Sequence, residues 1–343
     1  MSARAAISIL MPVRNGERFV VEAVESVLSQ TFADLELLVL DDGSADSTPQ
    51  ILERLARADS RLVVHRRQPG RNLAEALNAA AELSRAPLLA RLDADDVALP
   101  ERLRLQTEFL DENPDVALLG GQALLIDERG REFGRAEYPT GDGELQQALR
   151  ERNPFVHSAI AMRREAFEAV GGYRDNFDHA EDLDLWLRLA AGRQIANLPQ
   201  PVVKYRIHGD QQTLHKQDEQ ALFSVAARAS ARARTAGEPD PFEGTPIDEA
   251  LLISQGVGPA EVTGAVVPAL AWLARTTGRA GHPEDARRLF AAALARARSD
   301  SGSPALVASV YRSMGHRHAE QGQRFRAKLK AAQGRLAERG ARR

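Results

Sequence analysis

The chain has 343 residues, of which 27% are charged, and a formal net charge of −3 at pH 7. This length suits one large domain with a smaller one, and the nearly balanced charge gives no global nucleic-acid-binding signature. The sequence contains no cysteine, which excludes disulfides, thiolate nucleophiles and cysteine-based zinc sites. The apolar runs 116–126 and 262–274 are shorter than the roughly 18 residues of a membrane span. We therefore expect a cytoplasmic protein whose apolar N-terminal run forms a strand and not a secretory leader.

Strands and helices alternate through the first half of the chain. We expect strands at 7–11, 35–40, 61–65 and 90–92, a helix ending near 29, and helices at 49–57 and 72–85. Next should come a helix at 100–113, a buried strand at 116–126, a polar glycine-rich loop at 130–143, a strand and a helix before 171, a helix from 181 and a strand from 202. Because strands that alternate with helices form parallel sheets, this order predicts an α/β fold with a mostly parallel sheet.

Two of the predicted strands end in carboxylates. Asp41 and Asp42 follow the strand at 35–40, and Asp93, Asp95 and Asp96 follow the strand at 90–92. In an open α/β sheet ligands bind outside the carboxyl ends of the strands, so both acidic turns can face one crevice. Mg²⁺ and Mn²⁺ prefer carboxylate oxygens and leave room for phosphate oxygens, although an Asp-rich turn in solvent has the same composition.

Five motifs occur along the chain in the order of a known family. They are PVRNG at 12–16, SQTF at 29–32, DDGS at 41–44, DADD at 93–96 and EDLDLWLR at 181–188. Over roughly the first 210 residues the chain thus resembles a family 2 glycosyltransferase. The resemblance implies a GT-A fold, which is a Rossmann-like sheet flanked by helices. It also implies a divalent cation, Mn²⁺ or Mg²⁺, and transfer of sugar from a nucleotide-sugar with inversion at the anomeric carbon.

Processive polysaccharide synthases share this core but add transmembrane helices and a Gln-x-x-Arg-Trp motif. Neither of the two tryptophans of this chain, Trp186 and Trp272, is part of such a motif. We therefore expect non-processive transfer of one sugar at a time from a nucleotide-sugar, with a UDP-sugar as the expected donor, to a glycan, lipid-linked or protein-linked acceptor.

The metal ligands are assigned by the same resemblance. Asp95 corresponds to the principal ligand, and Asp93 contacts the ribose or the metal. Asp96 is expected to cap the turn that follows it. His208 lies in a segment that resembles the family's Tyr-Arg-x-His and is a further candidate ligand, since imidazole binds Mn²⁺. A lone surface histidine is otherwise commonplace.

The nucleotide should be recognised by the first half of the chain. Asp42, with Asp41 nearby, resembles the acid that accepts the ring N–H of the base, which favours uracil or thymine. The backbone at Pro12 and Arg14 would line the nucleoside pocket. Arg71 could pair with phosphate or base, or could be a solvated arginine before a helix.

The catalytic base is expected in the EDLDLWLR motif. Acidic residues in the first turn of a helix also complement its dipole, so capping is an alternative explanation. An acceptor hydroxyl is a poor nucleophile at neutral pH and needs a general base to take its proton. We choose Asp182, with Glu181 as the runner-up, because adjacent residues at a helix start point in different directions. His157, by resemblance, lies at the wall between donor and acceptor, or else it satisfies a buried backbone group.

The remaining sequence, 216–343, is rich in Ala and Arg and is predicted to be a helical extension to a catalytic domain at 1–215. The stretch 270–298 looks like one tetratricopeptide hairpin, and the tail from 321 is basic. A basic face is usually solvated but can also contact anionic lipid on the inner face of the membrane. We favour a homodimer formed through the extension. The competing function is a catalytically silent scaffold or sensor that binds a nucleotide-sugar and acts through these helices.

Overall fold

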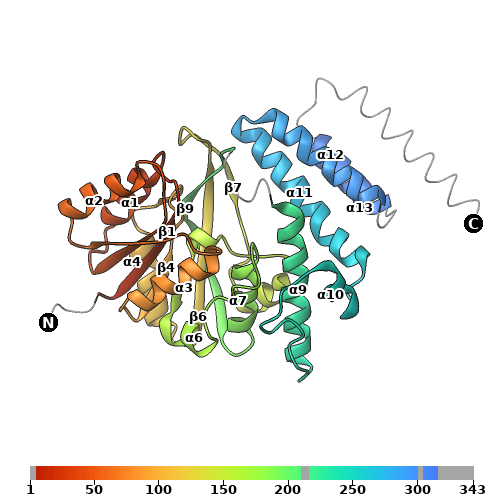
Figure 1. The fold of residues 1–343 in the computed structure, drawn as a ribbon, viewed down its shortest axis with the longest axis horizontal. Helices are drawn as coiled ribbons and strands as arrows, with labels where there is room; N and C mark the ends of the chain where they lie inside the picture. The colour runs from red at the N-terminus through yellow and green to blue at the C-terminus, as the bar shows by residue number, and fades with distance from the viewer. Residues whose placement is uncertain (1–4, 210–215, 300–303, 316–343) are drawn as a thin grey trace, which may run out of the picture. The chain divides into compact units, whose positions relative to one another are not determined.

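The computed structural model describes residues 5–209, 216–299 and 304–315, which Figure 1 draws as ribbons. Two compact units are present. Of the described residues, the first unit contains 5–207 and 226–247, and the second contains 208–209, 216–225, 248–299 and 304–315. The domain boundary predicted at 215/216 stays a prediction.

The first unit is built on a mixed sheet in the order β3-β2-β1-β4-β8-β6-β9-β5, with β7 paired to β6. Its parallel half consists of β1 (Ile7–Val13), β2 (Leu35–Asp42), β3 (Leu62–Arg67) and β4 (Leu88–Arg91). The other half consists of β5 (Val97–Ala98), β6 (Val116–Ile126), β7 (Glu132–Ala136), β8 (Ala161–Arg163) and β9 (Gln194–Arg206). There β6 and β9 run parallel, whereas β8 is antiparallel to both β4 and β6.

Helices flank this sheet. They are α1 (Val20–Leu28), α2 (Thr48–Ala58), α3 (Leu73–Leu83), α4 (Arg102–Glu112), α5 (Asp142–Leu149), α6 (Arg164–Ala169) and α7 (Glu181–Ala190), with the 3-10 turn η1 at His157–Ala159. All seven residues of β1 are buried, as expected for a central strand covered on both faces. The side chain of Asn72 accepts the Glu75 N–H at 3.1 Å and so caps the start of α3. The α/β fold class predicted from the sequence is confirmed.

One predicted loop is wrong. Within 130–143, residues 132–136 form β7, which pairs antiparallel with β6, and α5 begins at Asp142. The hairpin turn is fixed by Asp127, whose carboxylate accepts the N–H groups of Arg129 at 2.9 Å and Arg131 at 3.0 Å. Gly130 occupies the left-handed region of this turn, with φ of 76°.

The second unit is helical. It contains α10 (Glu249–Ser254), α11 (Pro259–Ala280), α12 (Pro283–Ser299) and α13 (Pro304–Gly315), while α9 (Gln217–Thr235) has residues in both units. The predicted hairpin at 270–298 is the end of α11 and most of α12, joined at Gly281 with φ of 103°. None of the helices among the described residues has the length and apolar character needed to cross a bilayer. The basic tail from 321 lies outside the described residues.

Candidate active site

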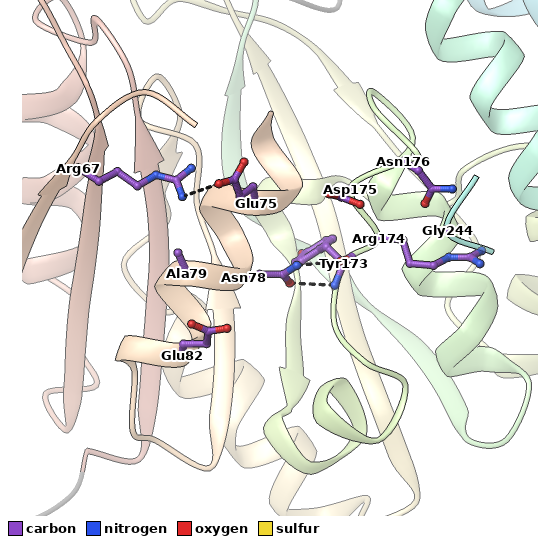
Figure 2. A pocket seen from close by; sticks show the side chains of 10 residues that line it. All are labelled: Arg67, Glu75, Asn78, Ala79, Glu82, Tyr173, Arg174, Asp175, Asn176 and Gly244. Carbon is purple, nitrogen blue, oxygen red and sulfur yellow. Dashed lines mark hydrogen bonds and ion pairs between the residues drawn. The ribbon is translucent and has the colours of Figure 1, made fainter. Parts of the chain in front are cut away.

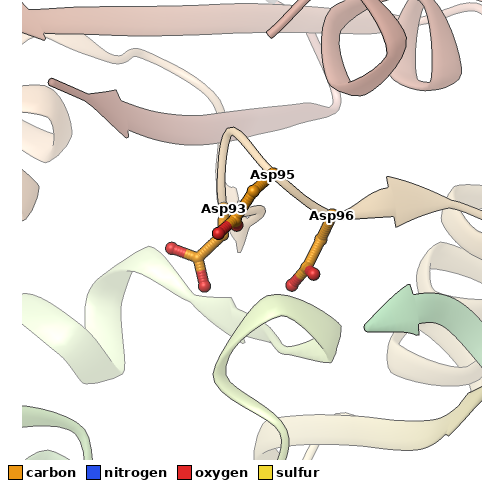
Figure 3. A group of neighbouring side chains, drawn as sticks. All are labelled: Asp93, Asp95 and Asp96. Atoms are coloured by element: carbon orange, nitrogen blue, oxygen red, sulfur yellow. The ribbon is translucent and has the colours of Figure 1, made fainter. Parts of the chain in front are cut away.

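Three aspartates gather on the turn between β4 and β5. Asp93, Asp95 and Asp96 each offer a carboxylate oxygen, and these oxygens lie within 4.8 Å of one another. Figure 3 shows the carboxylates of Asp93 and Asp96 pointing to the same side of the turn. The buried strand β4 ends two residues before Asp93, so the sheet delivers this cluster to its edge.

Asp93 is held by two neighbours. The Arg91 side chain is 2% exposed and forms a two-pronged ion pair with Asp93, in which Nη1 donates to Oδ2 at 2.5 Å. Ser158 donates its hydroxyl to the same carboxylate oxygen at 2.9 Å and accepts the Asp93 backbone N–H at 3.1 Å. The carboxylate therefore has a fixed orientation, although 31% of its side chain remains exposed.

Asp95 and Asp96 are fixed by Arg206 at the end of β9. The Arg206 backbone N–H donates to Asp96 Oδ1 at 2.8 Å, and its Nε donates to the Asp95 carbonyl at 2.7 Å. The Arg206 side chain is 1% exposed, pairs with Glu22 at 2.5 Å and lies 4.6 Å above the Phe19 ring. The expectation that Asp96 caps the following turn is wrong, because its carboxylate bonds the backbone of β9.

The aspartate cluster fits a hard divalent cation. Asp96 Oδ2 is buried and has no hydrogen-bond partner among the described residues. Burial and the charges of Asp95 and Asp93 raise the pKa of Asp96 well above its usual range. Clustered carboxylates with an unmatched buried oxygen are stabilised by a cation, and all-oxygen ligands suit Mg²⁺ or Mn²⁺.

A second acidic pair begins helix α7. Glu181 is 5% exposed, and burial together with the neighbouring Asp182 raises its pKa to about 8. Asp182 is half-buried, accepts the Asn153 side-chain amide at 2.6 Å and accepts the Leu183 N–H at 2.6 Å. Burial raises the pKa of Asp182 as well, while these two hydrogen bonds lower it.

His157 lies between the two acidic groups. Its Nδ1 is 4.0 Å from Glu181 Oε1, and its Nε2 is hydrogen-bonded to the Tyr173 hydroxyl at 2.9 Å. Its partner is thus a side chain and not the backbone group considered above. Burial, and the nearby Arg91, hold the pKa of His157 well below its usual range, so the ring is neutral at pH 7. The next residue, Ser158, bonds Asp93, so η1 contacts both acidic groups.

The turns after β1 and β2 are bound to each other. Asn15, at φ of 55°, donates its backbone N–H to Ser44 Oγ at 2.9 Å and accepts the Ala45 N–H at 2.8 Å. Asp41 is 1% exposed and accepts the Ser44 N–H at 2.9 Å, so its carboxylate holds the turn. Pro12 is buried in β1, and Arg14 beyond it is exposed.

Asp42 is the last residue of β2. Its Oδ1 accepts Arg67 Nε at 2.6 Å and the Gly70 N–H at 2.9 Å. Arg71 is exposed and pairs with Asp175 at 2.5 Å. The structure thus brings the β1 and β2 turns together and places Arg71 on the loop beyond Gly70. His208 belongs to the second unit, so its role as a ligand stays a prediction.

Several residues of this site were missed by the sequence analysis. Arg91, Ser158, Asn153 and Tyr173 each bond a group discussed above. Arg206 was quoted only as part of a motif. A signal existed for Arg91: the sequence predicted a strand at 90–92 that leads into Asp93, and side chains two residues apart in an extended chain share a face.

Residues 8–171 match the model of a protein family described as Glycosyl transferase family 2. Over 207 residues the chain is 32% identical to the amylovoran biosynthesis glycosyltransferase AmsE of Erwinia amylovora, covering 59% of this chain and 77% of that protein. It is 30% identical over 206 residues to the O-antigen biosynthesis glycosyltransferase WbnJ of Escherichia coli, covering 59% and 80%. The chain belongs to glycosyltransferase family 2.

Solved structures agree at the level of the fold. S. aureus TarS in complex with UDP-GlcNAc has a TM-score of 0.53 at 17% identity, covering 89% of each chain. The mannosyltransferase PcManGT of Pyrobaculum calidifontis, in complex with GDP-Man and Mn²⁺, also has a TM-score of 0.53, at 19% identity, covering 96% of this chain and 86% of that one. The protein is a glycosyltransferase with the GT-A fold that the resemblance implied.

Proposed function

We propose that this family 2 glycosyltransferase transfers a single sugar from a UDP-sugar to an acceptor hydroxyl, with inversion at the anomeric carbon and dependence on a divalent cation. The observation that carries the proposal is the position of η1. Ser158 bonds Asp93 in one acidic group, and His157 lies 4.0 Å from Glu181 in the other. One short turn therefore joins a metal-binding cluster to a pair of carboxylates that can serve as a base.

The first acidic group would hold the cation. Asp95 and Asp93 are the proposed ligands, Asp96 Oδ2 is available to join them, and His208 is a further candidate. When bound, Mn²⁺ or Mg²⁺ would stabilise the negative charge that builds on the departing diphosphate. Arg206 holds the turn that carries these ligands.

The second acidic group would remove the acceptor proton. When two carboxylates are adjacent, one retains its proton to higher pH, and here Glu181 has the pKa of about 8. Asp182 is the other carboxylate of the pair and the more exposed of the two, so we assign the base to Asp182. Its orientation is set by Asn153. Asp182 takes the acceptor proton as the hydroxyl attacks from the face opposite the diphosphate.

Base recognition is assigned to Asp42. Among the described residues, the hydrogen bonds of its carboxylate go to Oδ1, which leaves Oδ2 to accept a ring N–H from uracil. Pro12 and Arg14, with Asp41 behind them, would line the nucleoside site, and Arg71 would reach the phosphates. The nucleotide-sugars bound by TarS and PcManGT support a donor of this class.

The acceptor is proposed to be part of a surface glycan. AmsE and WbnJ are named for amylovoran and O-antigen biosynthesis, which are routes to polysaccharides. The silent scaffold considered above is not favoured, because the five carboxylates that the chemistry needs are present together: Asp42, Asp93, Asp95, Glu181 and Asp182.

The test is release of nucleoside diphosphate from a panel of UDP-sugars and GDP-sugars, with Mn²⁺ and with EDTA. We expect UDP release from one or more UDP-sugars that requires Mn²⁺ and is lost in Asp182→Asn. Release that persists in EDTA would contradict the metal dependence. Binding of UDP without turnover of any donor would support the scaffold function.

A further inference from the structure

Residues 226–247 lie beyond the stretch that matches the family, yet they form part of the first unit. Their contacts with the earlier part of this unit concentrate on the loop 173–180, which leads into α7. Asn176 Nδ2 donates to the carbonyls of Phe242 at 2.6 Å and Thr245 at 2.9 Å. The rings of Phe177 and Phe242 are fully buried, with centroids 6.4 Å apart. The segment is therefore packed against this loop.

A network of buried charges connects the same elements. Arg174 donates from Nε to Asp184 Oδ2 at 3.0 Å and from Nη1 to Asp240 Oδ2 at 2.8 Å. Its guanidinium also donates to Ser230 Oγ at 3.0 Å and lies 4.2 Å above the Phe177 ring. The Asp184 side chain is fully buried on α7, and that of Asp240 is 7% exposed. Arg174 thus joins the helix of the proposed base to the 226–247 segment.

We propose that Arg174 and Asp240 are positioning residues for sugar transfer. Their ion pair fixes the loop 173–180, from which α7 presents Glu181 and Asp182. The inference rests on the proposed function and extends it to a segment outside the family match. Neither residue contacts a reacting group, so both act through Asp184 and the loop.

The loop 173–180 has contacts on two sides. At its first residue, the Tyr173 backbone forms two hydrogen bonds with Asn78 of α3, at 2.8 and 2.9 Å. Beyond that point, the loop and α3 border an open pocket of about 510 Å³, lined by Arg174 and Asp175 on one side and Glu75 on the other (Figure 2). Next to the pocket, Arg71 pairs with Asp175 at 2.5 Å, and the Asn72 side chain donates to the Asp175 carbonyl at 2.7 Å. The contacts with 240–245 supply packing on another side.

Both ends of the loop matter for the site. Tyr173 bonds His157 at one end, and Glu181 begins α7 at the other. A displacement of about 1 Å at a reacting group can lower a rate roughly 10²-fold. Loss of the Asp240 charge leaves Arg174 less well compensated, which loosens the loop without touching the donor site.

The test uses the full chain with Asp240→Asn, and with Glu243→Gln as a control at an exposed position in the same segment. Three quantities are measured below the unfolding temperature. They are hydrogen exchange in peptides covering 173–183, calorimetric affinity for UDP with Mn²⁺, and kcat for UDP release from the UDP-sugar that the wild type turns over fastest.

In Asp240→Asn we expect exchange in 173–183 to be about tenfold faster, kcat to fall roughly 10- to 100-fold, and UDP affinity to be unchanged. The control should match the wild type in all three. Unchanged exchange, or faster exchange with unchanged kcat, would overturn the inference. If Asp240→Asn does not fold, the same three measurements are made on Asn176→Ala. This variant removes the hydrogen bonds from Asn176 to the Phe242 and Thr245 carbonyls, and its results are judged by the same criteria. Absence of turnover in the wild type would refute the proposed function, while hydrogen exchange would still show whether Asp240 fixes the loop.

Discussion

Replacement of Asp182 by Asn separates the role of this carboxylate in catalysis from its role in the fold. An Asn at this position keeps an oxygen that can accept the Asn153 amide N–H, as Asp182 does in the wild type at 2.6 Å. Its amide nitrogen then faces the Leu183 N–H, so the other 2.6 Å hydrogen bond is lost. One lost hydrogen bond costs about 1 kcal/mol, which lowers the unfolding temperature of a unit of this size by roughly 2–4 °C.

The expected effect on catalysis is larger. Loss of a general base lowers turnover by roughly 10²- to 10⁴-fold, which is about 3 to 5 kcal/mol in the activation barrier. Because Asp182 does not line the proposed nucleoside site, UDP affinity should change little. The assay is UDP release at saturating donor, alongside calorimetry with UDP and Mn²⁺ and a thermal unfolding scan.

Glu181→Gln is the matched variant, since it changes the adjacent carboxylate in the same way. We expect it to retain substantial turnover. Full activity in Asp182→Asn combined with an inactive Glu181→Gln would refute the argument from pKa and assign the base to Glu181.

Three further predictions follow from the acidic groups. Asp95→Ala should abolish Mn²⁺-dependent UDP binding without unfolding the protein, whereas Asp111→Ala on the exposed face of α4 should bind as the wild type does; calorimetry with and without Mn²⁺ checks this. Burial raises the pKa of Glu181 from 4.5 to about 8, so folding takes up a proton between these values, and the unfolding free energy should fall as pH rises through this window. In chelator-treated protein, Glu181→Gln should reduce this dependence of the unfolding free energy on pH. If urea titrations at pH 5 and 8 give the same difference in unfolding free energy for the variant and the wild type, the raised pKa of Glu181 is contradicted. Arg206→Lys should weaken Mn²⁺ binding about tenfold, because the hydrogen bond from Arg206 that holds the Asp95 turn is lost. Equal Mn²⁺ affinity in this variant and in the exposed control Arg129→Lys would show that Arg206 does not hold the turn for metal binding.

The elements that the sequence predicted well are those set by local signals. The strands β1 and β2 are mostly apolar, with Ser8 and Glu36 as polar members, and the acidic segments at the ends of β2 and β4 carry motifs of the family. Helix α7 begins at Glu181, as its acidic first turn predicted. The short strand β7 was missed because Glu132–Ala136 has little apolar character of its own. Its structure depends on pairing with β6 across the turn at Gly130, which is a tertiary contact.

The supporting arginines could not be identified from the sequence because arginine is usually a surface residue. Arg91 and Arg206 are 2% and 1% exposed, and each is bound by a group that is distant in sequence: Ser158 accepts from Arg91 at 3.2 Å, and the Asp95 carbonyl accepts from Arg206 at 2.7 Å. The role of 226–247 was missed for the same reason, since Asp240 meets Arg174 across 66 residues of sequence. The domain boundary at 215/216, the cytoplasmic location, the homodimer and the contact with a membrane surface stay predictions.

The two acidic groups of the site have different side chains beside them, and this difference supports the roles proposed for them. Arg91 pairs directly with Asp93, although burial raises the pKa of Asp93 overall. His157 lies 4.0 Å from Glu181, and it is neutral because burial and Arg91 both disfavour its protonation. Glu181 therefore lies next to a ring that offers no positive charge and retains its proton at pH 7. With its neighbour protonated, Asp182 can ionise without a second negative charge beside it, which is the state that a base needs before an acceptor hydroxyl arrives.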